Sequence, residues 1–203
     1  MPDQPEVVEI VKNPDEKVNF GGLWHIDTSY LPEPPLGSVL YAKEVPAVGG
    51  DTLFANMYMA YEALSDDVKE CLEGRRGINA ADKAEAASTR VRSIAERPGS
   101  GEGTSLVATH PILRTHPETG RKALYCSDAY TVSIEGMDPR ESKRLLEHLY
   151  EVQQRPQHCC RFHWEVGSMA FWDNRCTQNN ALNDYQGYRR VMQRDLLPLI
   201  WPV

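Results

Sequence analysis

The sequence predicts a mainly β protein with flanking helices, built as an antiparallel double-sheet barrel. Two observations favour this class over a parallel α/β fold: short β-leaning runs dominate, and few helical segments separate them. The sequence contains no internal repeat. A chain of 203 residues that is 41% hydrophobic can bury a sizeable core, so we expect one domain over residues 1–203.

The expected strands follow from β-leaning runs between turn residues. Residues 37–45 form one such run after a proline-rich turn. The stretch HPILRTHPETGRKALY, residues 110–125, predicts two strands joined by a turn at residues 117–120. Two further runs cover residues 158–166 and 168–172, and residues 189–197 form the last strand.

Helices are predicted where capping residues precede apolar periodicity. Asn56 is expected to cap one short helix, and Ser65 a second one. Asp138 followed by Pro139 marks the start of a longer helix, which should end before Pro156. Residues 79–105 are small and polar and become glycine-rich, so we expect a lid or a disordered insertion there.

Composition excludes several classes of protein. The net charge is −7 and no cluster of basic residues appears, so nucleic acid is not an expected partner. No apolar run approaches the roughly 18–20 residues of a membrane span. The five cysteines include no Cys-x-x-Cys pair, which argues against a disulfide framework and for a reducing, cytoplasmic location.

The stretch WHIDTSY, residues 24–30, carries the first sign of chemistry. If it forms a strand, His25 and Asp27 project from the same face and converge. A pair of this kind is either half of a metal site or an ordinary polar strand face. Non-haem iron oxygenases use two histidines and one carboxylate, which leaves open positions for a chelating 2-oxo acid and oxygen. An arginine would then suit the far carboxylate of that acid.

Four blocks together resemble the TauD/TfdA family of Fe(II)- and 2-oxoglutarate-dependent dioxygenases. These blocks are WHIDTSY, GGDTLFANMYMAYEALS, HPILRTHPETGRKALY and FWDNRCTQNNALNDYQGYRRVMQR, and in this order they span most of the chain. The resemblance implies a double-stranded β-helix, or jelly roll. It also implies Fe(II), 2-oxoglutarate and O2 as cofactor and co-substrates, with release of succinate and CO2 as a small organic substrate is hydroxylated or oxidatively cleaved.

The resemblance also assigns residues. His25 and Asp27 match two iron ligands, and Thr52 and Arg190 match the residues that bind 2-oxoglutarate. Two further matches concern the substrate. Arg194 corresponds to an arginine that often meets an anionic group, and Tyr125 to an aromatic residue that often lines the pocket.

The chain departs from the family pattern in three ways. The third iron ligand is usually the histidine of a Thr-Gln-His motif, and this sequence has Asn179 there. Gln193 replaces a histidine that usually precedes the last arginine. His25 also comes close to the start, where family members carry a substantial preceding segment.

Three interpretations of Asn179 stay open. Asn179 or a water completes a weaker iron site; another residue, such as His163 or Cys176, supplies the third ligand; or the protein is an inactive family member that acts by binding or interaction. A separate expectation concerns assembly. The exposed strand edges of a shortened jelly roll could pair in a homo-oligomer.

Overall fold

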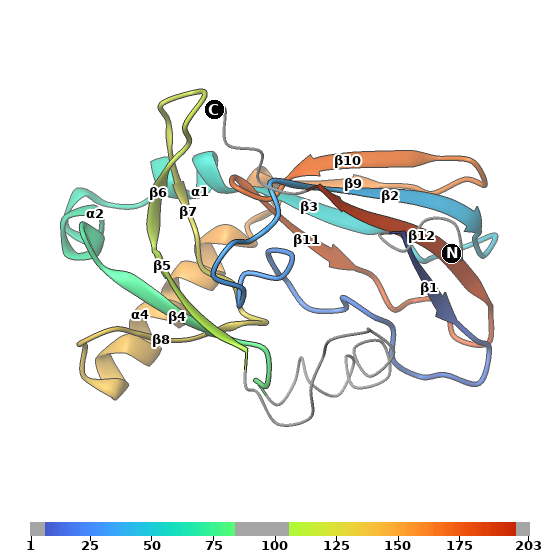
Figure 1. Ribbon diagram of the computed structural model, residues 1–203, viewed down its shortest axis with the longest axis horizontal. Helices are drawn as coiled ribbons and strands as arrows, with labels where there is room; N and C mark the ends of the chain where they lie inside the picture. Colours follow the sequence, from blue (N-terminus) through green and yellow to red (C-terminus); the bar gives the residue numbers. More distant parts are fainter. Residues whose placement is uncertain (1–6, 84–105, 198–203) are drawn as a thin grey trace.

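The computed structural model describes residues 7–83 and 106–197, and the strands in these ranges pair in antiparallel sheets (Figure 1). Two sheets face each other, with strand orders β1-β12-β2-β10 and β11-β3-β9. Their strands are β1 (Val8–Lys12), β2 (Gly37–Glu44), β3 (Thr52–Asn56), β9 (Cys159–Phe162), β10 (Met169–Asp173), β11 (Thr177–Ala181) and β12 (Arg190–Leu197). This arrangement confirms the predicted mainly β, jelly-roll class.

The space between the two sheets holds an apolar cluster and, next to it, a small cavity lined partly by polar side chains. Leu40, Ala42, Trp164, Trp172 and Met192 form the apolar cluster. Side chains alternate along a strand, so residues 190, 192 and 194 of β12 share the inward face. Two arginines therefore flank a buried methionine, and they point into the sandwich rather than into solvent.

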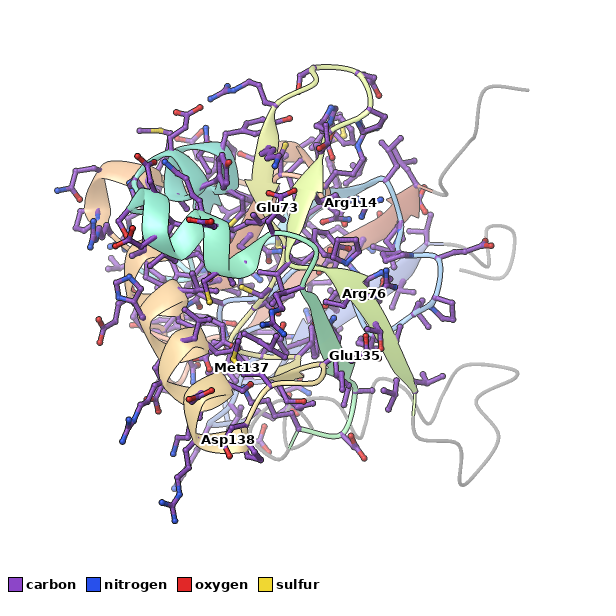
Figure 2. All side chains as sticks on the ribbon, turned by 90° about the vertical axis from the view of Figure 1, so that its left-hand side faces the viewer. Glu73, Arg76, Arg114, Glu135, Met137 and Asp138 are labelled. Carbon is purple, nitrogen blue, oxygen red and sulfur yellow. The ribbon has the colours of Figure 1, made fainter. Side chains whose placement is uncertain are left out.

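A second group of elements packs against one end of this sandwich (Figure 1). It contains a three-stranded sheet, β4 (Arg76–Ala80), β5 (Val107–Pro111) and β8 (Thr131–Ile134), and the hairpin β6 (Leu113–Thr115) and β7 (Lys122–Leu124). Figure 2 faces this end, where Arg76 and Glu135 form an exposed ion pair of 4.0 Å. Exposed pairs of this kind contribute little to stability.

The helices begin where the capping residues predict. The described helices are α1 (Met57–Glu62), α2 (Asp66–Leu72), α4 (Pro139–Gln153) and the 3₁₀ turn η1 (Pro156–His158). The side chain of Asn56 accepts hydrogen bonds from two main-chain amides of α1, and Asp138 does the same for α4. Ser65 precedes α2 without making a side-chain capping bond. The buried faces of α1 and α4 share one large core with β7 and β8.

Several predicted boundaries were wrong. Residues 79 and 80 belong to β4, so the expected insertion starts later, and its remainder falls mainly on residues 84–105, outside the described residues. The expected strand over residues 158–166 is shorter, because β9 ends at residue 162. The stretch around His25 is no strand: it makes one isolated bridge and then turns, with Thr28 at φ 50°.

One edge of β9 and one edge of β10 carry no partner strand among the described residues. A mainly apolar hollow of about 760 Å³ lies along these edges, and Phe171 and Met169 are exposed beside it. This geometry leaves homo-oligomerisation as a prediction. All five cysteines are free, and no helix in the described ranges is long and apolar enough to cross a membrane.

Candidate active site

One small cavity between the two sheets gathers six of the seven predicted site residues. Its wall comes from the segment before β2 and from the strands β1, β2, β3, β10, β11 and β12. The six are His25, Asp27, Thr52, Asn179, Arg190 and Arg194. Residues up to 169 positions apart in the sequence therefore meet in one place.

His25 and Asn179 are placed side by side by their main chains. The amide of each donates to the carbonyl of the other at 3.0 Å, which forms an isolated antiparallel bridge. Residues that face each other in this way project their side chains to the same face. Asn179 therefore occupies the position from which a third ligand would reach a metal held by His25.

The His25 imidazole is held between a main-chain carbonyl and the Asp27 carboxylate. Its Nδ1 lies 2.7 Å from the main-chain oxygen of Leu23. A carbonyl only accepts hydrogen bonds, so Nδ1 carries the proton. The other nitrogen, Nε2, lies 3.1 Å from Oδ1 of Asp27. Two arrangements explain this short distance. Either Nε2 also carries a proton that it donates to Asp27, or Nε2 carries none and its lone pair binds the same cation as the carboxylate. The second arrangement is that of a metal ligand fixed by an outer hydrogen bond.

Asp27 is a buried carboxylate with three neighbours. The hydroxyl of Ser38 donates to its Oδ2 at 2.5 Å, and Nη1 of Arg194 lies 3.7 Å from its Oδ1. Burial by itself raises the pKa of Asp27. The His25 interaction, the Arg194 charge and the Ser38 hydrogen bond outweigh burial and hold this pKa well below its ordinary value. The group is therefore a carboxylate, the form that binds cations.

Arg190 places a buried cation in the same cavity. The residue is 6% exposed, and its Nε and Nη2 have no hydrogen-bond partner in the described part of the chain. The guanidinium lies over the rings of Trp164 and Tyr185 at 5.9 Å and 6.0 Å. Burial lowers the pKa of Arg190, which remains charged because arginine keeps its proton in proteins. Buried donors without acceptors fit a bound anion.

Thr52 supplies a hydroxyl beside this cation. It is the first residue of β3 and is 2% exposed. Its Oγ1 accepts a hydrogen bond of 2.9 Å from the indole nitrogen of Trp164. Thr52 and Arg190 therefore offer donors to one ligand, while His25, Asp27 and Asn179 offer lone pairs to a cation. This donor set fits a metal ion and a carboxylate-bearing co-substrate in one cavity.

Tyr125 does not line this cavity. Its ring packs against His110 at 5.6 Å and beneath the guanidinium of Arg114 at 4.9 Å. The side chain is 1% exposed, and burial raises its pKa to about 12. The expectation that Tyr125 contacts a substrate is thus without support from the geometry, because the strand–turn–strand block folds into a separate part of the core.

The alternative third ligands also lie elsewhere. The side chain of His163 is 61% exposed and hydrogen-bonds to Asp51 at 2.8 Å. Cys176 lies near His116 and Asp173 in a group with metal-like spacing. The Nδ1 of His116 accepts from two main-chain amides, so its Nε2 is the nitrogen that donates to Asp173. His116 has no lone pair left, and the group is better explained as structural.

Comparison with protein-family models shows which family the chain belongs to. Residues 1–195 match the model described as taurine catabolism dioxygenase TauD, TfdA family. The chain belongs to the TauD/TfdA family. Members of this family are 2-oxoglutarate-dependent non-haem iron dioxygenases.

Two curated relatives of the chain are named as alpha-ketoglutarate-dependent dioxygenases of phenoxyalkanoates. The chain is 34% identical over 193 residues to the (S)-phenoxypropionate/alpha-ketoglutarate-dioxygenase of Sphingobium herbicidovorans, covering 94% of this chain and 64% of that protein. It is 33% identical over 177 residues to the alpha-ketoglutarate-dependent 2,4-dichlorophenoxyacetate dioxygenase of Burkholderia sp., covering 87% and 58%. The chain thus spans less than two thirds of the length of either relative.

Solved TauD/TfdA structures match the fold. A taurine dioxygenase from Burkholderia xenovorans superposes with a TM-score of 0.77 at 35% identity, covering 98% of this chain and 63% of that one. AAD-2 in complex with Mn(II) and N-oxalylglycine gives 0.75 at 30% identity, covering 88% and 64%.

The sequence did not predict the residues that contact the cavity-lining side chains from the surrounding core. Ser38, Trp164 and Tyr185 contact the predicted Asp27, Thr52 and Arg190 without any local motif that marks them. The one available signal is residue type, because buried tryptophan and tyrosine side chains need hydrogen-bond partners.

Proposed function

We propose that the protein is an Fe(II)- and 2-oxoglutarate-dependent dioxygenase that hydroxylates or oxidatively cleaves a small anionic organic substrate, with release of succinate and CO2. One observation carries the proposal: the buried Arg190 guanidinium, with two nitrogens that lack hydrogen-bond partners among the described residues, shares a cavity with the converging His25 and Asp27 side chains. A cation-binding pair beside an anion-binding group suits a metal with a chelating 2-oxo acid.

In this proposal His25 and Asp27 hold the metal, and Asn179 completes the set with its amide oxygen. An amide is a neutral and hard ligand, which suits Fe(II) but binds it more weakly than imidazole does. A bound iron would supply the chemistry for O2 activation coupled to the oxidative decarboxylation of 2-oxoglutarate. Thr52 and Arg190 hold the far carboxylate of that co-substrate, and the apolar wall from Trp172 and Leu40 excludes water.

Arg194 is proposed to bind the anionic group of the substrate. Its Nε has no hydrogen-bond partner among the described residues, and its guanidinium lies 5.0 Å from the ring of Phe20. Relatives named for sulfonate, sulfate ester and phenoxyalkanoate substrates all act on compounds that carry an anion. A bidentate guanidinium suits each of these groups.

A second candidate is a catalytically impaired family member that acts as a binding or interaction protein. Two observations favour it. Asn179 replaces the usual histidine ligand, and Arg194 lies 3.7 Å from Asp27, where its charge competes with a metal ion. Binding of 2-oxoglutarate without turnover would be its signature.

Succinate formation tests the proposal. The wild type should produce succinate from 2-oxoglutarate, and Arg190→Ala should abolish this. Arg189→Ala is the matched control, because the neighbouring Arg189 is exposed and pairs with Glu44 at the surface. Unchanged turnover in Arg190→Ala contradicts the assignment. Binding of 2-oxoglutarate with no turnover in the wild type favours the second candidate.

A further inference from the structure

We infer that Trp164 is a positioning residue for the co-substrate, fixing the hydroxyl of Thr52 as a donor and supporting the guanidinium of Arg190. The inference rests on the proposed function and extends it to a residue outside the cavity wall. Trp164 follows β9 and is 2% exposed, so its indole is part of the core between the sheets.

The direction of one hydrogen bond carries the argument. The indole Nε1 of Trp164 lies 2.9 Å from Oγ1 of Thr52, and both groups are buried. An indole N–H can only donate, so the threonine oxygen accepts. The single O–H hydrogen of Thr52 is then left for another partner. A carboxylate only accepts hydrogen bonds, so a hydroxyl held in this state is ready to bind it.

The same indole also contacts the second co-substrate residue. The ring of Trp164 lies 5.9 Å from Cζ of Arg190, and Tyr185 lies at 6.0 Å from the same atom. These contacts hold a planar, always-charged group that has unpartnered nitrogens. Trp164 therefore links the hydroxyl donor and the cation that the proposed function places on one carboxylate.

Trp164 is itself held in position by its neighbours in the sequence. Phe162 pairs with Thr52 in the β3–β9 ladder and packs on the Trp164 ring at 4.7 Å. His163 and Arg161 hydrogen-bond to the buried carboxylate of Asp51 at 2.8 Å and 2.5 Å. Residues 161–164 are thus attached to residues 51 and 52 at several points, which restricts the indole to one orientation.

Calorimetric titration with N-oxalylglycine tests the inference without turnover. N-oxalylglycine carries the same terminal carboxylates as 2-oxoglutarate, and Mn(II) serves as the metal. Trp164→Phe keeps an aromatic ring and removes the N–H, so we expect the dissociation constant to rise about fivefold to tenfold, as for the loss of one hydrogen bond between neutral groups. In a Thr52→Val background, Trp164→Phe should add little, because its effect passes through the hydroxyl.

Phe162→Leu is the control for packing. It disturbs the face of the indole and leaves the Trp164–Thr52 hydrogen bond intact. If Trp164 contributes only to packing, Phe162→Leu and Trp164→Phe should lose similar affinity for N-oxalylglycine when their unfolding midpoints fall by similar amounts. A positioning contribution predicts the loss of affinity in Trp164→Phe alone.

The outcomes separate this inference from the proposed function. No binding by the wild type overturns both. Equal affinities for the wild type and Trp164→Phe overturn the inference and leave the proposed function standing. Should Trp164→Phe fail to fold, the ¹⁵N–¹H signal of the Trp164 indole in the wild type decides. With diamagnetic Zn(II) in place of Mn(II), this signal should shift when N-oxalylglycine binds, because the acceptor of the indole N–H becomes a donor to the ligand, and an unmoved signal contradicts the inference.

Discussion

The main chains of His25 and Asn179 exchange two hydrogen bonds of 3.0 Å and place an imidazole beside an amide in the candidate active site. Asn179 therefore stands where a third metal ligand is geometrically possible, and its amide is one feature that should limit metal affinity. Exchanging that one side chain should change metal binding without rebuilding the fold.

Asn179→His should tighten the binding of Mn(II) or Fe(II) by at least about tenfold, because imidazole is a stronger ligand than an amide for divalent transition metals. Isothermal titration of the metal-free protein measures this directly. Asn180→His is the matched control, since side chains alternate along β11 and Asn180 does not line the cavity. Equal metal affinities in Asn179→His and Asn180→His would contradict the prediction that the side chain of residue 179 reaches the metal.

Arg194→Gln should strengthen metal binding several-fold in the absence of substrate. The guanidinium lies 3.7 Å from the Asp27 carboxylate, so its charge repels a divalent cation bound there. The same variant should lose affinity for anionic substrates. Metal titrations of Arg194→Gln and of the exposed-site control Arg189→Gln test the first effect, and weaker metal binding in Arg194→Gln alone would contradict it.

Ser38→Ala should weaken both the fold and the metal site. The buried hydroxyl donates to Asp27 and also accepts a hydrogen bond of 2.9 Å from Asn174. Loss of a hydrogen bond to a buried carboxylate costs about 1–3 kcal/mol. An outer-shell change of this kind lowers metal affinity by roughly 10–100-fold. Urea unfolding and metal titration measure the two effects, and an unchanged metal affinity would exclude a supporting contribution from Ser38.

The stability of the protein should fall in acid, partly through Asp173. Burial raises the pKa of Asp173, but hydrogen bonds from Arg175 and His116 outweigh burial and hold the pKa below its ordinary value. A depressed carboxyl pKa contributes stability above the unfolded-state pKa, and this contribution is lost as the pH falls through the folded-state value.

Asp173→Asn should therefore be less stable than the wild type at pH 7 and should lose less of its stability between pH 5 and pH 3. Urea unfolding across this range measures both slopes. Parallel curves for the two proteins would show that Asp173 does not contribute to the acid dependence.

The sequence predicted those parts of the site that local patterns or family blocks encode. His25, Asp27, Thr52, Asn179, Arg190 and Arg194 line one cavity. Their supporting contacts are long-range, as in the pair Trp164 and Thr52, which are 112 positions apart. Pairing of this kind depends on sheet register, which no local pattern reveals.

The fold shows the same division. Capping residues marked the starts of α1 and α4, because a cap is a local hydrogen-bonding signal. The strands β1, β3, β4, β8 and β11 were not predicted. In β3 and β11, polar residues that face the cavity, Thr52 and Asn179, interrupt the apolar alternation. The strand expected at His25 proved to be a turn with one bridge, yet the two side chains still converge.

An anaerobic titration of the metal-free protein with Fe(II) and 2-oxoglutarate tests the proposed site most directly, through the visible charge-transfer band of the chelate. The wild type should develop this band when both components are present, and Arg190→Ala should not develop it at matched concentrations. A folded wild-type protein that shows no band would contradict the proposal that His25, Asp27 and Asn179 assemble an iron site for a 2-oxo acid.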